Sequence, residues 1–298
     1  MSKSIWHPHL INDGYLPKAV SRFLLVSLNI DAILSEVTIR QRIKKLEEMT
    51  QGNGLSEAYT ATLERMKAQK RYKSVLGLKA LMWVLYSERT LRAEELCHAL
   101  GVEVGSADMD LENVPALRTV LSSCLGLITV ERSSSTVRLV HFTLQEYLSS
   151  DPTLFHSPHS EIAEVCLIYL NFGFVRDLSP IVHRIPPATP LVEYASVHWG
   201  RHMRKGVTEN TKILALRLLD RFDEHICAQL LLRSDWDIFL NIGVARPTRF
   251  KVLHVVAFLE IAEIATAVLN MKELHINAAD CTGNTALTWA VRRGHERE

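Results

Sequence analysis

The spacing of apolar residues along the chain predicts mostly α-helical structure, beginning with a helical segment over residues 1–73. Within it, apolar residues recur at i, i+3 and i+4, the spacing of one helix face. The expected helical stretches are Phe23–Leu34, Thr38–Met49 and a third that carries Tyr59, Leu63 and Met66.

Between residues 74 and 150 the pattern changes from helical spacing to short alternating runs near the end. Three helices are expected first: Val75–Tyr86, Arg92–Leu100 with Thr90 as its cap, and Ala116–Cys124. Two strand-like runs follow, Leu127–Arg132 and Thr136–Phe142, and three serines between them favour a hairpin. Three helices followed by a small β-hairpin predict a winged-helix domain over 74–150, with a short helix, Thr143–Leu148, closing it.

Residues 151–245 return to helical spacing and are interrupted by prolines. Helices are expected near Glu161–Asn171, Leu191–Arg204 and Thr211–Leu232. The last of these is expected to carry one apolar stripe, formed by Ile213, Leu216, Leu219 and Phe222. The pattern predicts a helical bundle.

The C-terminal part, 246–298, contains a repeat. Val252–Ala257 is similar to Ala286–Val291 at a shift of 34 residues, and Asp280–Leu287 resembles the β-turn and first helix of an ankyrin repeat. Ile261–Leu269 would then be an outer helix. The resemblance implies that His254 forms a hydrogen bond within the turn, which is a structural role. Because the second copy stops before its outer helix, we expect incomplete ankyrin repeats, which would bind protein partners.

Composition limits the functional classes. The 298 residues suffice for about two domains, and 34 basic against 33 acidic residues give a net charge of +1, so the whole chain does not attract nucleic acid or an anionic membrane. The apolar windows fall short of the ~20 residues that span a bilayer, and no signal peptide is evident. The five cysteines are widely spaced and lie among apolar residues, which predicts buried thiols in a reducing, cytoplasmic or nuclear compartment.

Several short sequence segments, taken together, resemble those of one protein family. Leu139–Leu148 is similar to the V-H-x-S-x-x-E-Y-L box that ends the winged-helix domain of fungal NACHT–ankyrin proteins, which are STAND ATPases like the NOD-like receptors. A related winged-helix domain is named after GPI inositol-deacylase. The other similar phrases, in order over residues 15–298, are Leu55–Arg65, Ala80–Leu96 and Pro190–His202.

The resemblance implies that an ATPase module precedes this region and that His141 matches the box histidine that contacts the ADP phosphate. The alternative is that His141 caps the strand-to-helix junction and meets no ligand. No G-x-x-x-x-G-K-[ST] motif occurs, so the chain is expected to need a separate or upstream module for any nucleotide and to have no cofactor of its own. We therefore predict a non-catalytic regulatory segment.

Other chemistry finds little support. The sequence has no G-x-S-x-G or H-E-x-x-H motif, and the pair His7 and His9 lies in a polar tail where we expect no metal site. A winged helix can read DNA, but residues 74–150 hold six basic and nine acidic residues, a net of −3. The basic run at Arg65, Lys67, Lys70, Arg71 and Lys73 is interpreted as a solvated helix face, with a nucleic-acid contact as the alternative.

Overall fold

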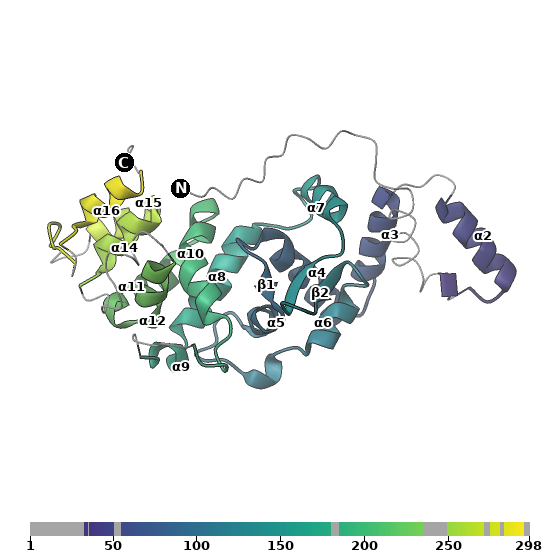
Figure 1. The fold of residues 1–298 in the computed structure, drawn as a ribbon, viewed down its shortest axis with the longest axis horizontal. Coiled ribbons are helices and arrows are strands. Elements are labelled where there is room, and N and C mark those ends of the chain that lie inside the picture. The colour runs from purple at the N-terminus through teal and green to yellow at the C-terminus, as the bar shows by residue number, and fades with distance from the viewer. Residues whose placement is uncertain are drawn as a thin grey trace.

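The computed structural model describes residues 33–34, 36–50, 55–179, 185–234, 249–270, 275–280 and 283–294. The protein is mostly helical with one small three-stranded sheet, as the sequence pattern predicted (Figure 1). The expected helix at Phe23–Leu34 falls largely outside the described residues, as do His7, His9 and Cys281.

The central part of the chain has winged-helix topology. Its elements follow the order helix, strand, helix, helix, strand, strand: α4 (Arg71–Tyr86), β1 (Leu91–Arg92), α5 (Ala93–Gly101), α6 (Leu117–Ser123), β2 (Ile128–Glu131) and β3 (Thr136–Leu139). The predicted hairpin of β2 and β3 is confirmed, and the antiparallel sheet has the order β1-β3-β2. The sequence analysis missed β1, which pairs Leu91 with Val137, and both side chains are buried.

Two helices flank this domain and pack on it. α3 (Leu55–Lys67) buries Tyr59, Leu63 and Met66, as predicted, and α7 (Phe142–Ser149) follows β3 directly. The hydroxyl groups of Tyr59 and Thr143 lie 2.8 Å apart and connect the two helices. α2 (Ile39–Thr50) lies apart from the other elements in Figure 1.

One predicted helix boundary in the winged helix is wrong. Thr90 does not cap α5, because the chain first forms β1 and the helix begins at Ala93 with Arg92 as its N-cap. Glu95 replaces the threonine in this role, since its carboxylate accepts a 2.7 Å hydrogen bond from the Arg92 N–H.

The helical region that follows is built around α8 (Pro158–Asn171), which is buried on most of its surface. α10 (Val192–Lys205) and α11 (Glu209–Leu219) pack on it, and α12 (Ile226–Arg233) packs on α10. Two short turns complete this part: α9 (Gly173–Arg176) after α8, and the 3₁₀ turn η2 (Phe222–Glu224) between α11 and α12; another 3₁₀ turn, η1 (Leu111–Asn113), precedes α6.

The prediction of one continuous helix over Thr211–Leu232 is wrong. The chain breaks after Leu219 because His225 caps α12: its Nδ1 accepts from the Cys227 N–H at 3.0 Å and its Nε2 donates to the Leu170 carbonyl at 3.0 Å. The predicted apolar stripe is also displaced, since the side chain of Ile213 is 64% exposed. The buried face of α11 is formed by Thr211, Ala215, Leu218 and Leu219.

Three helices end the described chain: α14 (Val252–Leu259), α15 (Ala262–Leu269) and α16 (Ala286–Arg292). Both segments related by the 34-residue shift begin a helix, and α16 packs against α14. Trp289 of α16 is buried between Phe250 and Phe258, and its indole N–H donates to Asp280 at 2.8 Å.

His254 links α14 to the segment that follows α15. Its Nδ1 accepts from the Lys251 N–H at 3.1 Å, and its Nε2 donates to the Ala278 carbonyl at 3.1 Å. These two bonds fix a neutral tautomer and satisfy two backbone groups. The histidine therefore has a structural function here.

One continuous buried cluster extends from Tyr59 in α3 to Trp289 in α16, so the winged helix and the helices after it share a core. The close approach of α10 to α14 depends on Gly200, where an added Cβ would lie 2.9 Å from the methyl carbons of Leu259. Among the described helices, none is both long and apolar enough to cross a bilayer.

The described cysteines are free and buried, as the sequence predicted for them. Burial raises the pKa of Cys97 to about 11 and that of Cys124 and of Cys227 to about 12. The pKa of Cys166, on α8, is raised as well, because it too is fully buried. All four remain neutral thiols at physiological pH.

We predict that Gly77→Ala destabilises the winged helix. An added Cβ at this position of α4 would lie 2.6 Å from the carbonyl oxygen of Ser123 in α6, so the helices would have to separate. Overpacking of this kind costs about 1–3 kcal/mol, against a helix-propensity gain of up to about 1 kcal/mol. Urea unfolding should show a lower unfolding free energy. The control is Val75→Ala on the same helix, where the side chain is 47% exposed. This substitution should change the unfolding free energy by no more than about 0.5 kcal/mol. A Gly77→Ala protein that is more stable than wild type would contradict the prediction.

Candidate functional site

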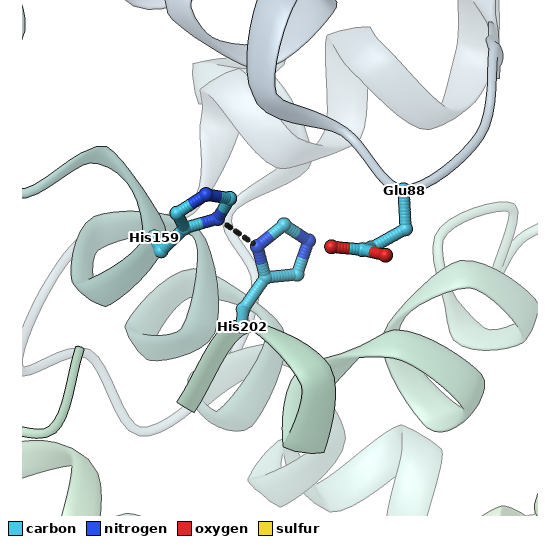
Figure 2. Close-up of side chains that lie close together, drawn as sticks. All are labelled: Glu88, His159 and His202. Carbon is cyan, nitrogen blue, oxygen red and sulfur yellow. Dashed lines mark hydrogen bonds between the residues drawn. The ribbon is translucent and has the colours of Figure 1, made fainter. Parts of the chain in front are cut away.

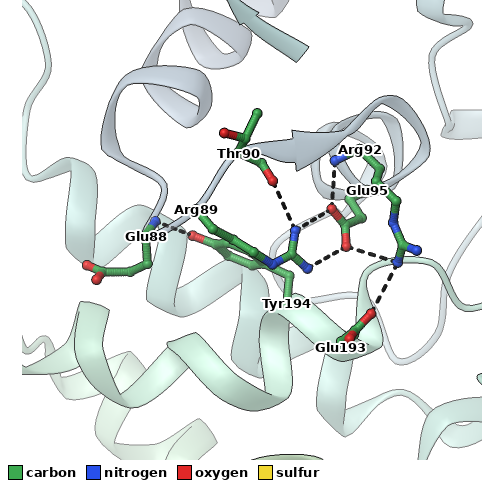
Figure 3. A network of polar contacts seen from close by, with 7 residues as sticks. All are labelled: Glu88, Arg89, Thr90, Arg92, Glu95, Glu193 and Tyr194. Atoms are coloured by element: carbon green, nitrogen blue, oxygen red, sulfur yellow. Dashed lines mark hydrogen bonds and ion pairs between the residues drawn. The ribbon is translucent and has the colours of Figure 1, made fainter. Parts of the chain in front are cut away.

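Several buried polar residues lie where the winged helix meets α10. The loop after α4 runs along this helix, and the rings of Trp83 and Tyr194 meet edge to face at a centroid distance of 5.9 Å. The Glu88 N–H donates to the Tyr194 hydroxyl at 3.1 Å (Figure 3). Lys205, at the end of α10, lies 2.6 Å from the Glu88 carboxylate. Contacts from both ends of α10 therefore hold the two parts of the chain together.

A buried carboxylate, that of Glu95, organises this junction. Arg89 donates to both of its oxygens, at 2.7 and 2.8 Å, and the Arg92 guanidinium donates to one of them at 3.2 Å (Figure 3). The same Arg92 nitrogen lies 3.4 Å from Glu193 on α10, and the Arg89 guanidinium lies over the Tyr194 ring at 5.2 Å. The network links the loop, α5 and α10.

Glu95 remains ionised in spite of its burial. Burial alone acts to raise the pKa of its carboxyl group, but the hydrogen bonds from Arg89 and from the Arg92 backbone, with the charges of both arginines, outweigh it and lower the pKa. The same contacts raise the pKa of Arg89. This arrangement is a fixed ion network and leaves no proton free for acid–base chemistry.

A second polar group lies on the other side of Tyr194. His159, in the first turn of α8, and His202, on α10, face each other with their Nδ1 atoms 2.9 Å apart, and Glu88 approaches His202 from the opposite side (Figure 2). The Tyr194 hydroxyl lies 2.8 Å from the other ring nitrogen of His202, Nε2. Glu88, Tyr194, His202 and His159 thus form a continuous chain of polar contacts from the winged helix to α8.

Both histidines are held in the neutral form. Burial, and then the proximity of His159, lowers the pKa of His202 to about 3. Burial also lowers the pKa of His159. Glu88 is ionised, since the hydrogen bond and charge of Lys205 outweigh its burial and lower its pKa. Neutral imidazoles beside a carboxylate have lone pairs that can bind a proton or a metal ion.

His141, the residue singled out by the sequence, lies at the junction of β3 and α7. It is the N-cap of α7, with Nδ1 3.3 Å from the donating Thr143 N–H and 2.9 Å from the Thr143 hydroxyl. The capping geometry considered as an alternative is therefore present. Because Nδ1 serves the cap, the ring proton lies on Nε2, for which the described residues provide no hydrogen-bond partner.

A small pocket lies beside His141, and its size limits what it can hold. It has a volume of about 270 Å³, slightly below the ~300–1,000 Å³ of typical small-molecule sites. Such a pocket fits an anion of phosphate size, and a whole nucleotide would need a second surface. Its polar lining consists of Ser87, Arg89, Thr90, Arg138, His141 and Gln145.

The positive charges of this pocket are already engaged. Arg89 binds Glu95, and Arg138 lies 2.6 Å from Glu131 on the neighbouring strand. An anion in the pocket would have to share these guanidinium groups, so the site alone provides a weak anion contact. The structure thus places His141 at a pocket edge, and it does not bring His141 together with the Glu88–His159–His202 group.

Sequence reasoning did not find the histidine–glutamate group. Its members come from the loop after α4, from α8 and from α10, and they lie 71 and 43 residues apart in the sequence. No local spacing of residues indicates such a group. The sequence analysis included His202 only within the Pro190–His202 segment that resembles the family. The other candidates, His7 and His9, lie outside the described residues.

We predict that Glu95→Gln destabilises the protein by roughly 2–4 kcal/mol, because two arginines lose their buried counter-charge. The loss should depend on pH. Since the folded pKa of Glu95 lies below its ordinary value of 4.5, its stabilisation is complete above that pH and is lost as the pH falls through the folded pKa. Urea unfolding from pH 7 to pH 3 measures this: the gap between wild type and variant should narrow below about pH 4.5. Glu94→Gln, at the exposed neighbouring position, is the control and should change little; equal effects of the two substitutions would contradict the prediction.

Comparison with known proteins identifies one part of the chain. Residues 63–163 match the family described as GPI inositol-deacylase, winged helix domain. The match starts in α3 and ends in α8, so it includes all six winged-helix elements and His141. Neither the curated proteins nor the solved structures provide a significant match. Sequence similarity and topology therefore agree that the chain contains a winged-helix domain.

Proposed function

We propose that this chain is a non-catalytic regulatory and protein-interaction segment of a NACHT–ankyrin type signalling protein, located in the cytoplasm. The observation that carries the proposal is the junction: the winged helix shares its core and a buried ion network with the helices that follow. A change in the position of the winged helix would therefore move α8 and α10 with it. Regulation by domain position requires this kind of rigid connection.

The nucleotide enters the proposal only through a separate or upstream ATPase module. His141 has its Nε2–H available beside a pocket of phosphate size, and Ser87 and Thr90 add hydroxyl groups to the lining. In the family that the sequence resembles, the corresponding histidine contacts the ADP phosphate. His141 would then report the nucleotide state of the module, while the chain itself would perform no chemistry.

The C-terminal helices support the protein-binding part of the proposal. α14 and α15 form a helix pair, and α16 repeats the position of α14 after 34 residues. His254 joins the first copy to the turn before the second, the structural contact that an ankyrin repeat uses. Leu287 and Val291, 74% and 68% exposed on α16, would pack against a further repeat, and a partner protein would bind the assembled array.

The DNA-binding alternative is not favoured by the charges of the domain. The exposed face of α6, where a recognition helix would contact DNA, carries Arg118 as its one basic residue. Arg89 and Arg92 are engaged by Glu95, and the domain as a whole is acidic. Phosphate contacts need an accessible basic surface.

We expect the native protein to be larger than this chain. An immunoblot of extract from the source organism, with an antibody raised against residues 74–150, should show a band well above 33.7 kDa, because the ATPase module and further repeats would belong to the same polypeptide. The control is the same antibody pre-incubated with the purified chain, which should remove the specific band. A single band at 33.7 kDa would contradict an ATPase module in the same polypeptide, and nucleotide control within one chain would be dropped.

We also expect no DNA retardation by the purified chain. Gel-shift assays with mixed-sequence duplexes at low salt, where electrostatic binding is strongest, should leave the DNA free. The informative variant is Glu94→Arg combined with Glu112→Arg, which adds positive charge at two exposed positions and tests whether the assay detects a more basic winged helix. Salt-sensitive retardation by the wild-type chain would establish the DNA-binding alternative instead.

A further inference from the structure

Three metal-ligand side chains from three different elements meet at the junction of the winged helix and the helical region. They are Glu88 from the loop after α4, His159 from α8 and His202 from α10, and one ligand atom of each lies within 4.8 Å of the others (Figure 2). Within the described part of the chain, no other group of three histidine, cysteine or acidic residues meets this criterion.

We propose that Glu88, His159 and His202 bind one divalent transition-metal ion of the zinc class, which fastens the winged helix to α8 and α10. Two imidazoles and a carboxylate form a ligand set that zinc uses, with a fourth position for water. In a tetrahedral site with bonds of about 2.0–2.1 Å, two ligand nitrogens lie about 3.3 Å apart. The Nδ1 atoms of the two histidines are 2.9 Å apart, so the rings would have to separate slightly to admit the ion. The Glu88 carboxylate, which approaches His202 from the other side in Figure 2, would have to swing toward the two Nδ1 atoms to complete the site.

The hydrogen bond between the two histidines sets how a proton must move when a metal binds. Between the two facing Nδ1 atoms only one hydrogen is present, and it moves to the other nitrogen of its own ring when the metal enters. The charge balance is therefore maintained without an acid or base from elsewhere.

The surroundings orient the ligands. The Tyr194 hydroxyl lies 2.8 Å from His202 Nε2. When Nδ1 is the metal ligand, the Nε2–H group donates a hydrogen bond to this hydroxyl. The same hydroxyl accepts from the Glu88 N–H, so one group positions both the buried histidine and the glutamate loop. Hydrogen bonds to the second ring nitrogen are typical of metal-binding histidines and fix the ring orientation.

Two nearby positive charges oppose the binding of a metal ion. The ammonium group of Lys205 lies 2.6 Å from the Glu88 carboxylate, and the Arg201 guanidinium lies 3.9 Å from it. Half of the Lys205 side chain is exposed, so the ammonium can move into solvent when the metal takes the carboxylate. Its charge still weakens cation binding at neutral pH. Removal of this charge should therefore tighten metal binding, which a purely structural ion pair does not predict.

The site would be structural. His202 is fully buried, and none of the three ligands lines the pocket beside His141. A bound ion would instead add bonds between segments that otherwise depend on Tyr194 and the Glu95 network. This proposal does not depend on the NACHT–ankyrin context, and it holds or fails independently of it.

The test is a titration of the full chain, freed of metal with a chelator, with Co²⁺ and then with Zn²⁺ as competitor. We expect one Co²⁺ per chain with visible d–d absorption, displacement by Zn²⁺, and a melting temperature that rises by several degrees at saturating Zn²⁺. His159→Asn should weaken binding more than about 100-fold, because loss of an outer partner alone costs about 10–100-fold. His156→Asn, at an exposed histidine three residues earlier, and the double change of His7 and His9 to Asn should bind as wild type does.

A further variant separates this site from other metal contacts. Lys205→Gln should bind Co²⁺ at least several-fold more tightly than the wild-type chain, and circular dichroism should confirm that it and His159→Asn are folded. The proposal is overturned if no d–d bands form, if folded His159→Asn binds as well as wild type, or if thiolate-to-cobalt charge transfer assigns the ion to cysteines. Equal or weaker binding by Lys205→Gln would remove Glu88 from the ligand set and overturn the trio as proposed.

Discussion

The carboxylate of Glu95 has no contact with solvent, and the arrangement of the junction follows from the need to compensate its charge. Two arginines and one backbone N–H surround it, and the arginines are in turn held by Tyr194 and Glu193 of α10. A buried charge of this kind tolerates few alternative geometries, because every partner must stay within hydrogen-bond distance. The network thus specifies how the winged helix sits on the helices that follow, while the shared apolar core provides most of the stability.

The features with a local signal could be predicted from the sequence. The hairpin was evident because alternating runs flank a serine turn, and Tyr59, Leu63 and Met66 were correctly placed on a buried face. Strand β1 was missed because two residues are too short for a periodic pattern, and its pairing with β3 depends on a segment 44 to 46 residues away. The break before α12 was missed for the same kind of reason, since the Leu170 carbonyl that fixes His225 is distant in sequence.

The candidate sites also divide into one that has a local sequence signal and one that depends on distant segments. His141 was found through a motif, and in the structure one of its ring nitrogens caps a helix while the residue lines a small pocket. The Glu88–His159–His202 group has no motif, because its geometry arises only when α8 and α10 pack beside the loop after α4. The role of Tyr194 could not be anticipated either, although one hydroxyl group contacts both the glutamate loop and the buried histidine.

The positions of the four buried thiols have a practical consequence for the dynamics of the chain. Cys97 and Cys124 lie within the winged helix, and Cys166 and Cys227 lie in the helical region beyond the junction. Because each is protonated and shielded, a thiol reagent can reach it only when its own part of the protein opens. The chain therefore carries natural reporters on both sides of the junction, and their relative alkylation rates would show whether the two parts open together as one cooperative unit or separately.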